Sequence, residues 1–348
     1  MKKRNQIVDV FKIVSAIFVV FLHFPFPGYL GKAVFSIARF AVPFFFIVSG
    51  YYYSKSNKKT QLAKTPAKIK YIFSLLLVSE LLGFMQKLLN HYDSQYSFLN
   101  NLKSVIIICL QNYNAEKWRA FSFTPLFNYS AWFLVQLIIV YAVFALITKF
   151  KLYNAAKIII PTCFIFGFFL IRICYFSNIS LPPYLDYFIM FMGVPFFSFG
   201  YYLKEHSFMP KINTLFLILL IILGAALSVL ESVFISTANL FFGSLVIDFV
   251  LTALFIKNAD ASMKTPIGKL LSFCGNKISL YVYILHPFVG NFVTVLINKL
   301  FGWNKLISYS MPLLVCIFTL LVSAFVYKIN SIIGKKIKEW KTNKEIKH

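Results

Sequence analysis

Apolar runs of about twenty residues recur along the whole chain, and they limit the possible folds more than any other feature. A helix of that length crosses the hydrocarbon core of a bilayer. The sequence therefore predicts an all-α, polytopic membrane helix bundle with about ten transmembrane helices. The predicted spans are residues 7–26, 34–53, 71–89, 130–148, 158–176, 185–203, 213–230, 239–256, 278–298 and 310–331.

Positive charge is distributed unevenly between the predicted loops. The chain carries 35 Lys and Arg against 11 Asp and Glu, a formal net charge of +24. Such a charge can indicate nucleic-acid binding, but here it gathers at the N-terminus, in every second loop and at the C-terminus, which is the positive-inside pattern. We therefore expect both termini to be cytoplasmic, and no nucleic acid as a partner. The basic clusters are residues 2–4, 55–70, 149–157, 204–211, 257–277 and 335–347.

The domain organisation is simple. Residues 1–333 are predicted to form one transmembrane domain, and residues 334–348 a basic cytoplasmic tail. The tail alternates lysines with apolar residues, a pattern typical of binding to anionic lipid headgroups. Five cysteines are scattered without metal-binding spacing, so we expect free packing cysteines and no metal site.

The longest stretch outside the predicted spans, residues 90–129, is expected on the outer side. Its apolar patch at residues 105–110 is too short to cross a membrane and predicts a re-entrant or interface-lying helix. Its aromatic residues suit either the faces of sugar rings or an interfacial aromatic belt, and the sequence leaves both open. These residues are Tyr92, Tyr96, Tyr113, Trp118, Phe121 and Phe123.

Two ionisable residues, Lys12 and His23, lie inside the first predicted span. Eleven residues apart on a helix, they share one face and lie roughly 16 Å apart along its axis. Ionisable residues in a membrane helix are costly and mark functional sites by default. Asp9, three residues before Lys12, forms either a local ion pair with it or part of a cytoplasmic cavity in which Lys12 contacts phosphate or pantetheine. The span favours an enzyme or a transporter over an inert scaffold.

His23 and Arg39 flank the turn between the first two predicted spans, where prolines break the helix. With the N-terminus inside, both residues fall near the outer side of the membrane. A neutral histidine can take a proton from a hydroxyl, and a nearby cation can stabilise a developing oxyanion. Alternatively, Arg39 extends to lipid headgroups and His23 satisfies a backbone carbonyl.

A second histidine, His286, lies within the ninth predicted span and precedes Pro287. Proline removes a helix hydrogen bond and frees carbonyls for polar partners, so this histidine is either functional or structural. Three acids in other predicted spans could orient a histidine, pair with an arginine or relay protons, and the sequence does not rank them. They are Glu80, Glu231 and Asp248.

These residues, in order and with their neighbours, resemble the membrane acyltransferase-3 family of O-acyltransferases. That family opens with a basic residue, ten positions and a histidine, which Lys12 and His23 match with Lys in place of the commoner Arg. The first cytoplasmic loop departs from the family's Arg-x-x-Arg element, since it holds only lysines, among them Lys68 and Lys70. The other matching segments are residues 39–51 (Arg-Phe…Pro-Phe-Phe…Ser-Gly), 132–141 (Trp-Phe-Leu…Tyr), 196–201 (Phe-Phe-Ser-Phe-Gly-Tyr) and 273–286 (Gly-Asn-Lys…His).

The resemblance implies a multi-pass cell-membrane enzyme that moves an acyl group from cytoplasmic acetyl-CoA to a hydroxyl of a surface polysaccharide or lipid-linked glycan. In this hypothesis His23 is the general base, Arg39 stabilises the oxyanion and His286 is a second acid/base group or a substrate ligand. Direct transfer and a transient acyl-histidine are both open at this point. The expected CoA contacts are Asp9, Lys12, Lys68 and Lys70.

Two other functions compete with this hypothesis. A secondary transporter or polysaccharide exporter could use the same histidines and acids as a proton relay. The sequence shows no internal repeat of the kind that many transporters carry, which disfavours this alternative. A membrane sensor or structural partner would leave the intramembrane Lys12, His23, Arg39 and His286 unexplained.

Overall fold

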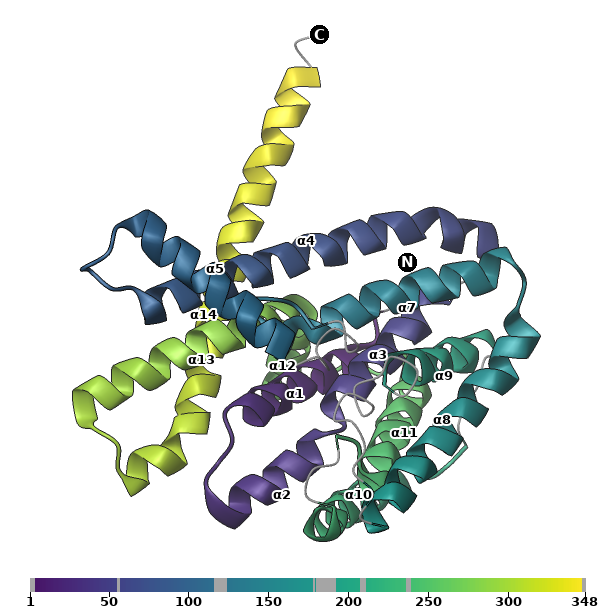
Figure 1. The fold of residues 1–348 in the computed structure, drawn as a ribbon. Helices are drawn as coiled ribbons and strands as arrows, with labels where there is room; N and C mark the ends of the chain where they lie inside the picture. Colours follow the sequence, from purple (N-terminus) through teal and green to yellow (C-terminus); the bar gives the residue numbers. More distant parts are fainter. Residues whose placement is uncertain are drawn as a thin grey trace. The chain divides into compact units, whose positions relative to one another are not determined.

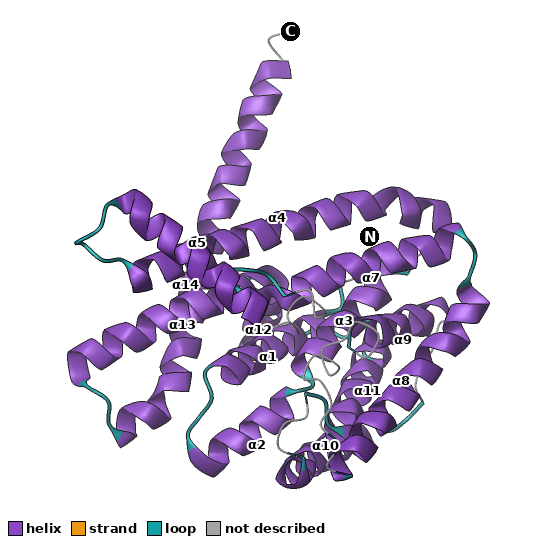
Figure 2. Cartoon of the chain, viewed as in Figure 1, coloured by secondary structure: helices purple, strands orange, loops and turns teal. Residues whose placement is uncertain are grey.

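The computed structural model describes residues 4–54, 57–115, 124–177, 179, 192–206, 211–235 and 239–345. Within these ranges the regular elements are helices joined by loops, as Figures 1 and 2 show. The predicted all-α fold is therefore confirmed for the described part of the chain. The α-helices are α1 (Gln6–His23), α2 (Gly28–Ala38), α3 (Ala41–Tyr53), α4 (Lys58–His91), α5 (Phe98–Ala115), α7 (Trp132–Lys149), α8 (Tyr153–Phe176), α9 (Gly193–Glu205), α10 (Thr214–Phe234), α11 (Phe242–Lys257), α12 (Pro266–Lys277), α13 (Ser279–Phe301) and α14 (Lys305–Glu345), with a 3₁₀ helix η1 (Tyr129–Ala131) before α7.

Eight segments of the described chain are long and apolar enough to cross a membrane: α1, α2 with α3, α4, η1 with α7, α8, α10, α13 and α14. They match eight of the ten predicted spans. The predicted span 239–256 corresponds to α11, whose 16 residues rise only about 24 Å. The predicted span 185–203 corresponds in part to α9, which has 13 residues, while residues 185–191 lie outside the described chain.

The chain forms two compact units, and each is described by itself. The first unit combines residues 1–31 with residues 259–348, and the second comprises residues 32–258. In the first unit α1 packs against α12, α13 and α14, and α13 packs along α14. The first and last parts of the sequence thus build one packing unit. Helix α14 continues from Lys305 to Glu345, so no helix end marks the predicted start of the tail at residue 334.

Helices α3 and α9 of the second unit pack extensively against each other, and two glycines explain their close approach. A Cβ atom at Gly50 would overlap the carbonyl of Phe197, and one at Gly200 would overlap the carbonyl of Ile47. Each glycine therefore meets the backbone three residues before the glycine of the other helix. Small residues at helix crossings allow this approach within membranes. Both helices carry Pro-Phe-Phe followed by Gly-Tyr-Tyr, with two more residues between these elements in α3.

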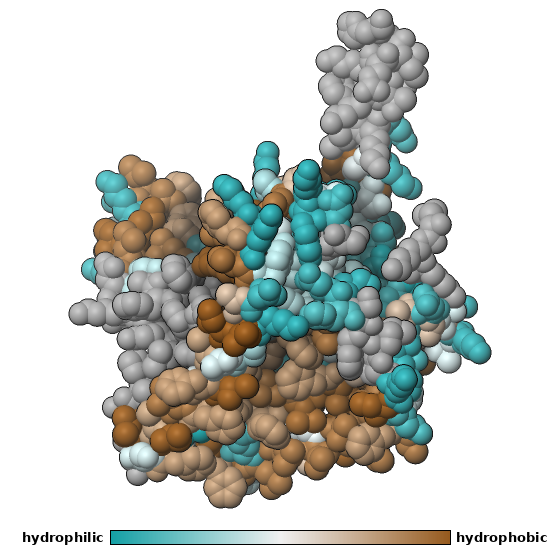
Figure 3. All heavy atoms as spheres, turned by 90° about the vertical axis from the view of Figure 1, so that its right-hand side faces the viewer, coloured by the Kyte–Doolittle hydropathy of each residue, from teal (hydrophilic) through white to brown (hydrophobic). Residues whose placement is uncertain are grey.

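Helices differ strongly in how much of their surface the protein covers. Only 17% of the spanning window is buried in α4 and α10 and 22% in α8, against 56% in α2–α3 and in η1–α7. The exposed side chains of α8 and α10 are mainly Leu, Ile, Val and Phe. Figure 3 shows apolar residues gathered over one part of a face and hydrophilic residues over another. Contiguous exposed apolar surface of this kind fits contact with lipid chains.

The predicted short helix in the stretch 90–129 is confirmed as α5, which is not among the eight spanning candidates. The turn before it is held by Asn101, whose side-chain amide donates to the carbonyls of Asp93, Tyr96 and Ser97. Trp118, Phe121 and Phe123 lie outside the described residues. Whether α5 is re-entrant or lies at the interface stays a prediction.

Candidate active site

Two histidines from opposite ends of the sequence lie side by side in the first unit. His23 is the last residue of α1, and His286 lies in the first half of α13. Their ring centroids are 4.9 Å apart and their planes are tilted by 40°. His286 is completely buried, whereas His23 is exposed. The structure thus brings together two of the three residues that the sequence indicated as catalytic.

Pro287 explains how the ring of His286 is oriented. Proline has no backbone N–H, so the carbonyl of Tyr283, four residues earlier, loses its usual helix partner. The Nδ1 atom of His286 lies 2.7 Å from that oxygen and 3.3 Å from the carbonyl oxygen of Val282. Carbonyl oxygens only accept hydrogen bonds, so Nδ1 carries a proton and donates it. In the neutral ring the lone pair is then on Nε2.

The Nε2 atom of His286 is buried and has no hydrogen-bond partner among the described residues. Buried polar atoms are usually hydrogen-bonded, and an exception needs an explanation. The ring of His23 lies beside this ring, so the unpartnered nitrogen belongs to a pair of histidines from α1 and α13. A lone pair in such a site can accept a proton or a hydrogen bond from a hydroxyl.

A close contact next to the histidines fixes the end of α1 against α13. Phe24 follows His23 and ends the helix, its N–H donating to the carbonyl of Val20 at 2.9 Å. A Cβ atom at Gly290 would overlap the ring of Phe24. Gly290 lies one turn after His286, on the same face of α13. The missing side chain therefore lets the end of α1 reach α13.

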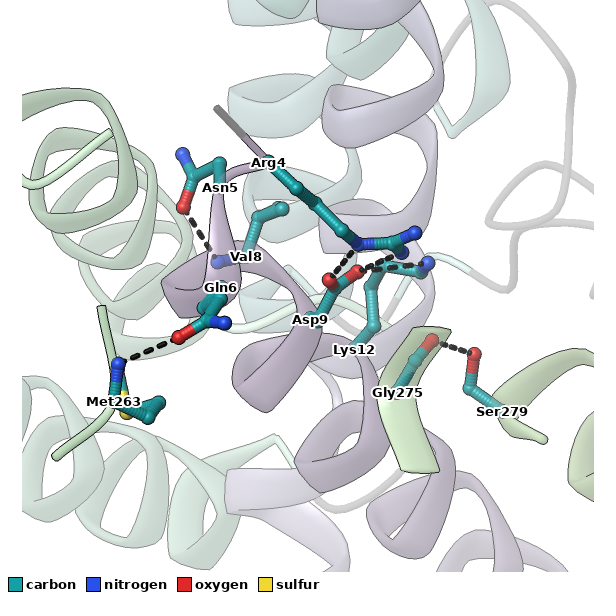
Figure 4. A network of polar contacts seen from close by, with 9 residues as sticks. All are labelled: Arg4, Asn5, Gln6, Val8, Asp9, Lys12, Met263, Gly275 and Ser279. Atoms are coloured by element: carbon teal, nitrogen blue, oxygen red, sulfur yellow. Dashed lines mark hydrogen bonds and ion pairs between the residues drawn. The ribbon is translucent and has the colours of Figure 1, made fainter. Parts of the chain in front are cut away.

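The opposite end of α1 holds a group of charges around Asp9 (Figure 4). The Asp9 carboxylate is 2% exposed and accepts from Arg4 at 2.5 and 2.9 Å, and Lys12 Nζ lies 3.5 Å from the same carboxylate. The local Asp9–Lys12 ion pair is thus present, and Arg4 joins it. Sequence analysis missed Arg4, although an arginine five residues before a buried acid was visible. One acid against two bases leaves this group with a net positive charge.

Helix α12 was also missed, because its residues were assigned to a basic loop. Thr265 caps its first turn by accepting from the N–H of Gly268, and Pro266 is its first residue. This Thr-Pro pair is a helix-start signal that could have found it. A Cβ atom at Gly275 would overlap the Asp9 carbonyl, so α12 packs directly on the start of α1. Figure 4 also shows Ser279 donating to the Gly275 carbonyl at 2.7 Å, where α13 begins.

Arg39, the third predicted catalytic residue, belongs to the second unit. It lies in the short break between α2 and α3, with its guanidinium carbon 4.0 Å from the centre of the Phe35 ring. That cation–π contact keeps the charge near its own helix. The expectation that the turn brings His23 and Arg39 to similar depth stays a prediction.

The predicted CoA contacts Lys68 and Lys70 also belong to the second unit, where their surroundings differ. Lys70 is exposed. Lys68 is half-buried, with its Nζ 5.1 Å from the ring centre of Tyr53 and 5.2 Å from that of Tyr141. The ammonium group of Lys68 therefore contacts two aromatic rings, whereas the side chain of Lys70 is exposed.

Lys68 is part of a larger group that we call the tyrosine–lysine cluster. Its Lys58 lies 2.7 Å from the hydroxyl of Tyr201 and 3.1 Å from Glu205, and its Lys204 lies 3.5 Å from the hydroxyl of Tyr51. Sequence analysis missed this cluster, although the two Gly-Tyr-Tyr elements, each close to lysines, were a signal for it. The cluster consists of Tyr51, Tyr53, Tyr141, Tyr201, Lys58, Lys68 and Lys204.

The structure distinguishes the three acids of the predicted spans by their hydrogen-bond partners. Glu80 accepts from the backbone N–H groups of Phe127 and Asn128 at 3.0 and 2.8 Å, so it anchors a loop. Glu231 pairs with Arg172 at 2.6 Å. Asp248 is completely buried in α11, and neither of its carboxyl oxygens has a hydrogen-bond partner in the described part of the chain.

The family model described as "Acyltransferase domain", that of the acyltransferase-3 family, matches residues 5–328, nearly the whole chain. No curated protein and no solved structure matches the chain. The matched range includes both histidines and the eight candidate spanning segments up to residue 328. The chain therefore belongs to the acyltransferase-3 family, membrane enzymes of the O-acyltransferase type.

Proposed function

We propose that this protein transfers an acetyl group from cytoplasmic acetyl-CoA to a hydroxyl of a cell-surface polysaccharide or lipid-linked glycan. The observation that carries the proposal is the His23–His286 pair, in which Pro287 and Tyr283 leave the lone pair of His286 on a buried nitrogen without a partner among the described residues. Acyl transfer to a hydroxyl needs a base at the oxygen that attacks. Family membership supports the acyl-transfer chemistry.

In the proposed reaction His23 takes the proton of the acceptor hydroxyl as its oxygen attacks the thioester carbonyl. The C–S bond then breaks, and the proton passes to the departing sulfur, so an ester and free CoA result. His286 serves as a second acid/base group through Nε2. A cationic side chain near the carbonyl oxygen of the thioester would stabilise the oxyanion that forms there. Arg39 is proposed for this role from its place in the family pattern alone.

Donor binding is proposed from the basic groups described above. Lys12 shares Asp9 with Arg4, so the group retains positive charge that a CoA phosphate could neutralise. Lysines bind phosphate as point charges, without the planar fork of arginine. Lys68 and Lys70 remain proposed donor contacts, and the rest of the tyrosine–lysine cluster adds Lys58 and Lys204. The transporter or exporter alternative would use the histidines and Asp248 as a proton relay, and family membership favours acyl transfer over it.

The test is an assay in membranes with acetyl-CoA labelled in its acetyl group. Thioester cleavage and label in the glycan are measured for the native protein, His23→Ala and, as a matched control, His91→Ala, whose side chain is exposed at the end of α4. Losing a general base lowers the rate by about 10²–10⁴-fold, so His23→Ala should lose transfer while His91→Ala retains it. Full glycan acetylation by His23→Ala at native protein level would refute the proposed base. Mass spectrometry of surface glycans with and without the gene identifies the acceptor.

A further inference from the structure

A groove opens between α8, α9 and α11 of the second unit. The histidine pair belongs to the first unit and takes no part in it. The volume of the groove is about 430 Å³, within the range of sites that hold one small molecule. Each helix contributes one stripe of side chains: Lys157, Phe164 and Phe168 are among those of α8, Phe199 and Tyr202 among those of α9, and Phe249 is one from α11.

Most side chains that line the groove are apolar, so the groove suits an apolar ligand. Of its fourteen residues only Lys157, Ser198 and Tyr202 have polar side-chain groups. The hydroxyl of Ser198 donates to the Pro195 carbonyl at 2.8 Å, and that of Tyr202 donates to the Tyr153 carbonyl at 2.9 Å. Both hydroxyl protons are thus used within the protein. The Lys157 ammonium is the polar group that the lining offers to a ligand.

Lys157 lies in the second turn of α8, at one end of the groove, and its side chain is exposed. Its Nζ is 3.1 Å from Nε2 of His206, a bond that uses one of three ammonium protons. The neighbouring acid, Glu205, lies 3.1 Å from Lys58. The head of the groove therefore carries positive charge, and it lies beside the basic loop that the sequence places on the inner side.

The length of the groove suits one lipid chain. From Lys157 to Phe169, the last lining residue of α8, the helix rises about 18 Å, close to the roughly 15 Å of hydrocarbon in one leaflet. Ile165 and Phe169 are 55% and 57% exposed, so this side of α8 faces outward. We propose that the groove binds one acyl chain of an anionic phospholipid of the inner leaflet, with the lipid phosphate on Lys157.

Native mass spectrometry of the full chain in detergent tests this proposal. The probes are dioleoyl phosphatidylglycerol, dioleoyl phosphatidylcholine and dihexanoyl phosphatidylglycerol, which separate the contributions of charge and chain. Lys157→Gln should weaken binding of the long-chain anionic lipid about tenfold, because a charge-assisted bond to phosphate is lost. Lys151→Gln changes an exposed lysine just before α8 and outside the lining, so it is the matched control and should bind normally.

A second pair of variants tests the chain. Ser198→Phe fills the groove and should abolish the preference for the long-chain over the short-chain lipid, whereas Ser198→Ala should keep it. Equal losses in Lys157→Gln and Lys151→Gln would mean general attraction to a basic surface and overturn the proposal. Equal binding of phosphatidylcholine and phosphatidylglycerol would overturn it too. If Ser198→Phe does not fold, the exposed Lys157 variants and the chain-length comparison still decide the outcome.

Discussion

The His23–His286 pair of the first unit and the Arg172–Glu231 pair of the second both place ionisable groups inside a membrane protein, but their bonding differs. Arg172 donates to Glu231 at 2.6 and 3.1 Å, to the Leu240 carbonyl at 2.9 Å and to the Phe168 carbonyl at 3.1 Å. Glu231 in turn accepts from the N–H of Phe242 at 2.6 Å. The histidine pair instead leaves Nε2 of His286 buried and unpartnered within the described residues.

This contrast separates a structural use of polar groups from a chemical one. The Arg172–Glu231 network is closed, and it ties the end of α8 to the end of α10 and the start of α11. A closed network of charges is hard to open for a substrate, because each lost partner leaves a buried charge uncompensated. The histidine pair instead has one unpartnered ring nitrogen among the described residues, and Pro287 explains how that ring is oriented. Of these two pairs, the histidine pair is the one suited to accept and release protons.

We expect the largest effect from a variant that removes the unpartnered Nε2 atom of His286. We expect His286→Ala to lower kcat per folded molecule by about 10²-fold or more. Because the ring is completely buried and donates to the Tyr283 carbonyl, the variant should also lose stability, so turnover is normalised to folded protein. If the two histidines act as one unit, the double variant His23→Ala/His286→Ala will be no slower than the slower single variant, because such effects are not additive. Multiplicative losses in the double variant would show that the rings act independently.

The next effect is expected on stability rather than on activity. Arg172→Met leaves Glu231 partly buried without its cation, which should cost about 3–5 kcal/mol in the free energy of unfolding. Turnover per folded molecule should stay native. The double variant Arg172→Met/Glu231→Gln removes the stranded charge and should recover part of the loss. Chemical unfolding in detergent, with activity measured on the same samples, checks both; lost turnover in a fully folded variant would place this pair in the chemistry.

A smaller effect is expected where proline fixes the tautomer. Pro287→Ala restores an N–H that competes with His286 for the Tyr283 carbonyl. Because the Nδ1 bond weakens, the ring should sample other orientations, and kcat should fall about tenfold or less, within the range of one positioning contact. Nitrogen-15 chemical shifts of His286 would report the tautomer directly. Native turnover together with a changed tautomer would mean that the fixed orientation does not matter for the reaction.

The sequence predicted these regions unequally, for a physical reason. Helix length and hydropathy indicate the spans, and spacing within one helix indicates the Asp9–Lys12 pair and the role of Pro287. Which helices pack together is not written in hydropathy, because lipid-facing and protein-facing side chains are both apolar in a membrane. The contact of His23 with His286, the docking of α12 and the α8–α9–α11 groove all depend on that choice, so they required coordinates.

We expect the smallest effects at Lys68 and Lys70, which the sequence predicted equally as CoA contacts. Lys68 rests on the rings of Tyr53 and Tyr141, and Lys68→Met should cost about 0.5–2 kcal/mol of stability through the lost cation–π contacts. Lys70 is exposed, and Lys70→Met should change stability by no more than about 0.5 kcal/mol.

Their kinetics decide whether either lysine binds the donor. Loss of a donor contact at either lysine would raise KM for acetyl-CoA and leave kcat unchanged, because uniform binding is lost. If only Lys70→Met shows this, the tyrosine–lysine cluster is a structural network like that of Arg172. If only Lys68→Met raises KM for acetyl-CoA, the aromatic rings position the Lys68 ammonium for the CoA phosphates. The tyrosine–lysine cluster then takes part in donor binding. Native KM in both variants would remove these two lysines from the donor site.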